Sequence, residues 1–216
     1  MKQKRLLIFD LDGTLIDTVG DLNAAVNYAL KKYNFEEKTI LHTRNAIGNG
    51  VAMLIARSIP NGKENPVYAE CLETFRDYYS KHLSVHSLPY NGIFDTLVKL
   101  KEKGYDLAVV SNKFNEGANE LVKYFFKDIF SYIQGINPPL KAKPSSDMVN
   151  HVLNILGYKI EEALYIGDTE VDYQTAVNSG LDVVLVSYGY RTREQLGERT
   201  KKAPIIDAPQ DLLKVL

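Results

Sequence analysis

The chain has 216 residues, of which 45% are apolar and 25% are charged. This suits a globular protein with one large domain, or a domain with a modest insertion. The formal net charge is −1, so the basic excess that attracts a nucleic-acid backbone is missing, and we expect no nucleic-acid partner. The single cysteine, Cys71, excludes an internal disulfide framework and a zinc site built from several cysteines.

The N-terminal segment favours neither a secretion signal nor a membrane anchor. The basic stretch Met1–Arg5 is followed by a short apolar run, Leu6–Phe9, and then by Asp10. That run is too short for the apolar centre of a signal peptide and far too short to span a membrane. We therefore expect no membrane partner and a location in the reducing cytoplasm.

Short apolar runs predict the strands of a parallel sheet. They are rich in Leu, Ile and Val and lack polar alternation, as is typical of strands covered on both faces. In chain order they are Leu6–Phe9, Leu107–Val110, Ala163–Ile166 and Val183–Val186, with Ile129–Ile133 as a weaker candidate. Helical patterns lie between them, at 93–103, 146–156 and 171–179. This alternation predicts an α/β fold with a doubly wound parallel sheet.

Residues 17–87 break the alternation. Helical patterns are predicted there at 21–33, 43–58 and 66–83, and Gly48 and Gly50 interrupt the second of them. The segment is too long for an ordinary loop. We therefore predict an α-helical cap domain of residues 17–87, inserted into an α/β core formed by residues 1–16 and 88–216. Two chain crossings of this kind suit a hinged lid.

Acidic residues follow two of the predicted strands. Asp10 and Asp12 lie two apart in an extended segment, so their side chains point the same way. Neighbouring carboxylates repel unless one is protonated or a cation is recruited, and Mg²⁺ suits oxygen ligands near phosphate. Asp168 follows the strand predicted at 163–166. Asp172 lies in the first turn of the next helix, where it could also be a simple cap.

Polar residues follow the strand predicted at 107–110. Ser111, Asn112 and Lys113 offer a hydroxyl, a carboxamide and backbone N–H groups at the expected start of a helix, a combination that binds anions. Ligands of open α/β sheets bind at the carboxyl ends of the strands. We therefore expect this anion site and the acids to meet at one edge of the sheet.

Four segments together resemble the four motifs of the haloacid dehalogenase superfamily. They are Phe9-Asp10-Leu11-Asp12-Gly13-Thr14-Leu15, Val110-Ser111-Asn112, Lys143-Pro144 and Gly167-Asp168-Thr169-Glu170-Val171-Asp172. Their order and spacing fit, and the resemblance covers essentially the whole chain.

The resemblance implies a phosphatase that works through an aspartyl phosphate. Asp10 would attack phosphorus, and Asp12 would protonate the leaving alkoxide and then activate water. Asp10, the backbone carbonyl of Asp12 and Asp168 would hold Mg²⁺. Lys143 would neutralise charge and fix Asp10, and Asp172 would orient Lys143 or a metal-bound water.

The same resemblance assigns phosphate oxygens to Ser111, the amide of Asn112 and Thr14. Dehalogenases of the superfamily need no metal and lack the second acid of the first motif. Asp12 is present here, which favours a phosphatase.

The helical insertion resembles the cap of phosphoglycolate phosphatases, which have a similar Gly48-Asn49-Gly50 stretch. This implies a small phosphorylated metabolite as substrate, with Arg44, Asn49 and Lys113 as candidates for contacting it. Arg44 could instead be a solvated surface arginine, and Lys113 a charge in a first helical turn. We expect a monomer or a homodimer, because no sustained heptad pattern is visible.

Other activities remain open at the level of sequence. A phosphomutase of the same branch, similar to β-phosphoglucomutase, would return the phosphoryl group to a second hydroxyl. Pyrophosphatases and nucleotidases share the motifs. A phosphate-sensing module phosphorylated on Asp10 is a third alternative, although such modules usually lack an inserted lid and the acid at position 12.

Overall fold

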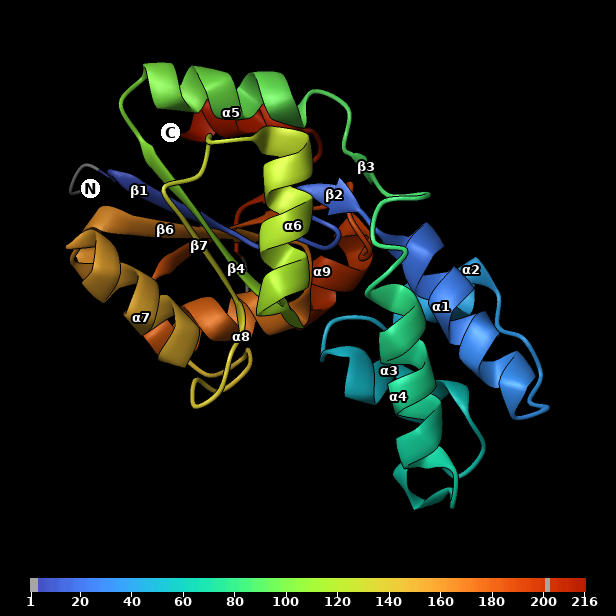
Figure 1. Ribbon diagram of the computed structural model, residues 1–216. Coiled ribbons are helices and arrows are strands. Elements are labelled where there is room, and N and C mark those ends of the chain that lie inside the picture. Colours follow the sequence, from blue (N-terminus) through green and yellow to red (C-terminus); the bar gives the residue numbers. More distant parts are fainter. Residues whose placement is uncertain (1–3, 201–202) are drawn as a thin grey trace. The chain divides into compact units, whose positions relative to one another are not determined.

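The computed structural model describes residues 4–200 and 203–216, and the chain folds as two compact units (Figure 1). One unit contains the chain up to Ile16 together with the chain from Pro89 onward, and the other spans Asp17–Leu88. Within the described residues, no helix combines the length and apolar character needed to cross a membrane.

The larger unit is built on a six-stranded sheet with the order β5-β4-β1-β6-β7-β8, and every pair in it is parallel. The strands are β1 (Leu6–Phe9), β4 (Asp106–Phe114), β5 (Tyr132–Ile136), β6 (Ala163–Gly167), β7 (Asp182–Val186) and β8 (Ile205–Ile206). The chain first adds strands on one side of β1 and then on the other. The predicted α/β fold is confirmed, and the strand order reverses beside β1, where such sheets bind ligands.

Helices cover both faces of this sheet (Figure 1). They are α5 (Ile93–Glu102), α6 (Asn115–Phe126), α7 (Asp147–Leu156), α8 (Glu170–Ser179), α9 (Arg193–Arg199) and α10 (Leu212–Val215), with 3₁₀ turns at Ile160–Glu162 and Pro209–Asp211. On one face, Met148 and Val152 of α7 pack in a buried cluster with Leu6 and Ile8 of β1. On the other, Phe9 packs edge-on against Phe130, with ring centroids 6.1 Å apart. Alternate residues of β1 thus fill two cores, which fixes the strand that precedes Asp10.

Two predicted elements are shifted in the structure. The strand expected at 129–133 forms three residues later, at Tyr132–Ile136. Ser111, Asn112 and Lys113 were expected to open a helix, but β4 continues through Phe114, and α6 begins only at Asn115. The strand continues because Phe114 pairs with Ile136 of β5, beyond a register shift in the pairing of β4 with β5. This pairing keeps the backbone of residues 111–114 extended.

The smaller unit is helical. Its elements are α1 (Val19–Lys32), α2 (Ile40–Ala46), α3 (Val51–Ser58), a 3₁₀ turn (Gly62–Glu64) and α4 (Tyr68–Tyr79), and α1 packs against both α2 and α4. The helix predicted at 43–58 is divided between α2 and α3. Gly48 and Gly50 lie in the break with φ of 123° and 78°, a region that L side chains avoid.

A buried carboxylate ties the two ends of the smaller unit together. Asp21, in the first turn of α1, accepts hydrogen bonds from the backbone N–H groups of His86 and Ser87, each at 2.9 Å. The Ser87 hydroxyl donates a third, at 2.6 Å. Nearby, β2 (Ile16–Asp17) and β3 (Leu88–Pro89) form a separate two-stranded sheet.

Candidate active site

Three carboxylates meet at the carboxyl ends of β1 and β6. The Asp10 N–H donates to the carbonyl of Ile166 at 2.8 Å, so the chain leaving β1 stays beside β6. Asp10 is 7% exposed, and Asp168 and Asp172 are fully buried. Each of these residues offers a carboxylate oxygen within 4.8 Å of the other two. The sequence-predicted acids Asp10, Asp168 and Asp172 therefore form one cluster.

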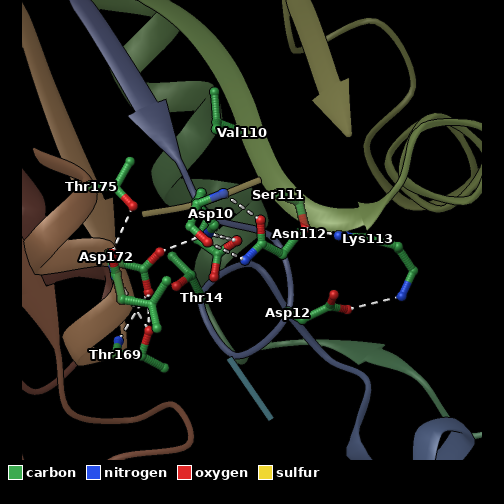
Figure 2. Close-up of polar contacts among 12 residues, drawn as sticks. Asp10, Asp12, Thr14, Val110, Ser111, Asn112, Lys113, Thr169, Asp172 and Thr175 are labelled. Atoms are coloured by element: carbon green, nitrogen blue, oxygen red, sulfur yellow. Dashed lines mark hydrogen bonds and ion pairs between the residues drawn. The ribbon is translucent and has the colours of Figure 1, made fainter. Parts of the chain in front are cut away.

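Asp172 is both a helix cap and an ion-pair partner (Figure 2). Its Oδ2 accepts hydrogen bonds from the N–H groups of Thr169 and Asp168, at 3.0 and 3.2 Å, and from the Thr169 hydroxyl at 2.7 Å. Its Oδ1 lies 2.7 Å from the Lys143 Nζ. The cap therefore fixes the carboxylate that faces the lysine.

Lys143 is enclosed between two acids. Its Nζ lies 2.6 Å from Asp10 Oδ1 and 2.7 Å from Asp172 Oδ1, and the residue is 5% exposed. The Asn112 carboxamide holds the backbone of Lys143 from both sides: it accepts from the N–H at 2.8 Å and donates to the carbonyl at 3.1 Å. Asn112 thus places the lysine from 31 residues away.

Burial and mutual repulsion determine the charge of these groups. Burial, followed by repulsion from Asp172, raises the pKa of Asp10 to about 7 in spite of Lys143. The pKa of Asp168 is raised well above its ordinary value by burial and by the Asp172 and Asp10 carboxylates. Burial alone would lower the pKa of Lys143, but Asp10 and Asp172 hold it well above its ordinary value. The lysine therefore stays charged while the carboxylates compete for protons.

Both oxygens of Asp168 have protein donors. The Thr14 hydroxyl donates to Oδ1 at 3.2 Å, and the Tyr190 N–H donates to Oδ2 at 2.8 Å. Gly13 and Gly189 approach this carboxylate so closely that a Cβ on either would overlap Asp168. The hydroxyl of Thr14, which was predicted to bind phosphate, here donates to Asp168.

The site also contains residues that the sequence did not single out as functional. Gly189 and Tyr190 follow β7, so the strand-end rule that drew attention to the acids would have pointed to them. Tyr165, within β6, is fully buried, and its hydroxyl lies 3.4 Å from Asp172 Oδ1. No local pattern in the sequence distinguishes it from an ordinary core residue.

Asp12 points away from the acid cluster. Its Oδ1 lies 3.1 Å from the Lys113 Nζ, and Figure 2 shows the two side chains turned toward each other, on the opposite side of Asp10 from Asp172. Ser111 and Asn112 lie between these groups in the same view. The Ser111 Oγ accepts from the N–H of Lys113 at 3.1 Å, which leaves the hydroxyl hydrogen to be donated elsewhere.

Arg44 and Asn49 belong to the helical unit. Arg44 lies on α2 and is partly buried, whereas Asn49 is exposed in the break between α2 and α3. Arg57 anchors that break: it donates to the Asn49 Oδ1 at 2.8 Å and to the Ala46 carbonyl at 2.6 Å. The Asn49 carboxamide therefore helps to hold the shape of its own loop.

The acid cluster fits a hard divalent cation. Asp10, Asp168 and Asp172 bring three buried carboxylates together, and the Lys143 ammonium contacts two of them, Asp10 and Asp172, so the acids outnumber the ammonium. Carboxylate oxygens are the ligands that Mg²⁺ takes in proteins. A cation held there would favour the ionised acids and relieve the repulsion that raises the pKa values of Asp10 and Asp168.

Comparison with known proteins decides the family. Residues 7–186 match the family model described as "Haloacid dehalogenase-like hydrolase". The chain belongs to the haloacid dehalogenase-like hydrolases. That match runs from β1 to the end of β7 and so includes all four motif segments.

Curated relatives of this hydrolase are phosphatases. The chain is 34% identical to "Phosphoglycolate phosphatase" from Aquifex aeolicus (strain VF5), over 98% of this chain and 96% of the relative. It is 36% identical to the protein of the same name from Psychrobacter arcticus, over 87% and 85% of the two chains. A crystal structure of a candidate phosphoglycolate phosphatase from Lactobacillus delbrueckii subsp. bulgaricus superposes with a TM-score of 0.93 at 32% identity, covering 100% and 98% of the chains. The predicted family and the prediction of a phosphatase are confirmed.

Proposed function

We propose that this hydrolase cleaves a small phosphate monoester by nucleophilic attack of Asp10 on phosphorus, with Mg²⁺ as cofactor. The observation that supports this most strongly is the cluster of Asp10, Asp168 and Asp172 at the sheet edge where the strand order reverses, with Lys143 in contact with Asp10 and Asp172. Catalysis of phosphoryl transfer consists mostly of holding the nucleophile in place and stabilising negative charge on the phosphoryl oxygens. In this cluster Asp10 is the fixed nucleophile, and Lys143 together with the proposed Mg²⁺ would supply the positive charge.

The reaction proceeds in two balanced steps. In the first, an Asp10 oxygen bonds to phosphorus, the bond from phosphorus to the leaving oxygen breaks, and Asp12 gives that oxygen a proton. In the second, Asp12 takes a proton from water, the water oxygen bonds to phosphorus, and the bond to Asp10 breaks to release inorganic phosphate. The covalent intermediate replaces one difficult displacement by two easier ones.

The remaining residues hold the reactants. Lys143 fixes the attacking oxygen of Asp10, and Asp172 fixes Lys143. The Ser111 hydroxyl and the Asn112 N–H donate to phosphate oxygens. Thr14, proposed from the sequence as a further phosphate ligand, contributes through Asp168. Asp10, the carbonyl of Asp12 and Asp168 would hold Mg²⁺, which supplies charge stabilisation to the phosphoryl oxygens.

The substrate is proposed to be a compact metabolite such as phosphoglycolate. This rests on the names of the relatives, which match along nearly the full chain. We further propose that residues 17–87 form a cap domain inserted into a core of residues 1–16 and 88–216, with Arg44 and Asn49 as substrate-contact candidates. A reducing cytoplasm suits the buried, unoxidised Cys71.

Replacement of the nucleophile tests the mechanism. Asp10→Asn should lower Mg²⁺-dependent release of inorganic phosphate from an aryl phosphate by roughly a thousandfold or more, because an amide cannot form the phosphoenzyme. Asp95→Asn is the matched control, because Asp95 is an exposed acid on α5, and it should keep full activity. Circular dichroism should show both variants folded. Mg²⁺-dependent turnover by folded Asp10→Asn protein would refute the mechanism.

A substrate panel separates the remaining alternatives. We would measure kcat/KM with phosphoglycolate, pyrophosphate, nucleotides and sugar phosphates in the presence of Mg²⁺. The proposal predicts the highest value for phosphoglycolate. A dependence of turnover on a sugar bisphosphate would instead identify a phosphomutase.

A further inference from the structure

Lys113 is a buried lysine at the end of β4 whose charge the mechanism above does not use. Its side chain is 2% exposed, and its Nζ lies 3.1 Å from the Asp12 Oδ1, whereas the Asp12 side chain is 16% exposed. Lys113 lies in β4 and Asp12 lies just beyond the neighbouring strand β1, 101 positions away in the sequence. The fold therefore places a second ammonium beside the proposed proton donor.

The two lysines of the site differ in how firmly they are held. Lys143 lies between Asp10 and Asp172, at 2.6 and 2.7 Å, and both acids are buried. Lys113 pairs with a carboxylate that is partly open to solvent. A buried ammonium requires an anion, since removing its partner without replacement is strongly unfavourable. An anion that reaches Lys113 can therefore compete with Asp12 for the ammonium, whereas an uncharged group competes less well.

The position of Asp12 determines which anion could take its place. Under the proposed function, the leaving oxygen of the substrate lies within hydrogen-bond reach of the Asp12 carboxylate. The Lys113 ammonium is in contact with that same carboxylate. If the leaving oxygen binds beside the Asp12–Lys113 pair, an anionic group attached one carbon beyond that oxygen would reach Lys113.

We infer that Lys113 is a specificity-determining residue that exchanges Asp12 for a second anionic group of the substrate. In the free enzyme it pairs with Asp12. When a compact phosphate ester with a carboxylate next to the ester carbon binds, the carboxylate takes over Lys113, and Asp12 is free to turn toward the leaving oxygen. An ester without that charge leaves the pair intact and is processed more slowly. This inference rests on the proposed function and adds the feature of the substrate that releases Asp12.

The test compares two substrates that differ in one charge: phosphoglycolate and glycolamide phosphate, in which an uncharged amide replaces the carboxylate. Wild type should prefer phosphoglycolate in kcat/KM. Lys113→Met, which keeps the length of the side chain and removes its charge, should lower that preference at least tenfold, mainly through phosphoglycolate. Lys113→Arg should restore most of it, because arginine also binds carboxylates.

The matched control is Lys123→Met, an exposed lysine on α6, which should leave the preference unchanged. If Lys113→Met slows both esters by the same factor, Lys113 supports only the structure and the inference is wrong. If wild type does not prefer the charged ester, the inference also fails, although an inactive Asp10→Asn variant would still support the proposed chemistry. Activity of Asp10→Asn would refute the proposed function independently of either result.

Discussion

Asp168 is enclosed by protein on both of its carboxylate oxygens. Thr14 and Tyr190 donate to them, and the backbones of Gly13 and Gly189 approach the carboxylate closely. The close approach of Gly189 is possible only without a side chain, because a Cβ would overlap the Gly13 carbonyl oxygen and Asp168. The side chain proposed to bind the cation is thus positioned by the backbone of a loop far away in the sequence.

This enclosure makes Gly189→Ala a sensitive test of the site. The added methyl group must displace either Asp168 or the Gly13 carbonyl, so we expect Mg²⁺ binding, measured by titration calorimetry, and turnover each to weaken by roughly tenfold or more. Gly197→Ala is the control, because no atom lies within 4 Å of the Cβ position there. It should preserve activity and stabilise α9 by up to about 1 kcal/mol. Unchanged Mg²⁺ binding in Gly189→Ala would show that the enclosure is not needed.

At the level of elements, β4 carries polar groups at both of its ends. Its carboxyl end provides Ser111, Asn112 and Lys113, which face the site. At its other end, the Asp106 carboxylate accepts hydrogen bonds from the Tyr158 hydroxyl at 2.6 Å, from Lys101 at 3.2 Å and from Ser131 at 3.3 Å. These donors come from the segments that precede and follow β4 and from the turn after α7, so one acid joins several neighbouring segments.

The Asp106 cluster should make stability depend on pH. The hydrogen bond from Tyr158, aided by Lys101 and Ser131, holds the pKa of Asp106 below its ordinary value. When the pKa of an acid is lower in the folded chain than in the unfolded chain, its ionisation stabilises the fold. This stabilisation is fully present at pH values above the pKa in the unfolded chain, which is about 4. It is lost as the pH falls through the pKa in the folded chain. Tyr158→Phe should therefore lower the free energy of unfolding by about 1 kcal/mol at pH 7.

Urea unfolding at several pH values measures this effect. The difference between wild type and Tyr158→Phe should shrink as pH falls below about 4, and it should be largely absent in an Asp106→Asn background. Tyr124→Phe is the control, because the Tyr124 ring lies 68% exposed on α6, and it should change little at any pH. A difference that is constant from neutral to acid pH would contradict this assignment.

The elements also differ in how well their sequences predict them. The residues of β1 are all buried and apolar, so the strand and the acid after it could be located directly. In β5, Gln134 and Gly135 are buried and interrupt the apolar run, which is why the prediction was three residues early. The Lys113–Asp12 contact has no local signal at all, because tertiary pairing of β1 with β4 creates it.

At the scale of the whole molecule, charge is balanced in total but not in position. There are 27 acidic and 26 basic residues, yet three buried acids gather at one edge of the sheet, two of them in contact with Lys143. A cation that binds only the folded chain stabilises it, by about 2.7 kcal/mol at a concentration one hundred times its Kd. Under the proposed function, the acid cluster would therefore link folding to Mg²⁺.

We expect Mg²⁺ to raise the Tm of the wild-type protein and EDTA to reverse the increase. Asp168→Asn should abolish the response. In EDTA the Asp168→Asn variant should be about as stable as wild type. The hydrogen bonds that it loses are offset by the removal of a buried carboxyl group, whose raised pKa shows that its ionised form is disfavoured. Asp128→Asn, at an exposed acid after α6, should retain the full response. A response to Mg²⁺ that survives in Asp168→Asn would show that the ion binds elsewhere.

The tie at Asp21 has an evolutionary consequence. The Asp21 carboxylate binds the backbone N–H groups of His86 and Ser87, which lie 65 and 66 positions further along the chain. The two ends of the segment between these residues are therefore held together by a contact within the helical unit. Insertions, deletions or wholesale replacement inside such a closed segment need not strain the chain on either side of it. The segment between Asp21 and His86 can therefore change in length and sequence while the strand ends that carry Asp10 and Asp168 stay unaltered.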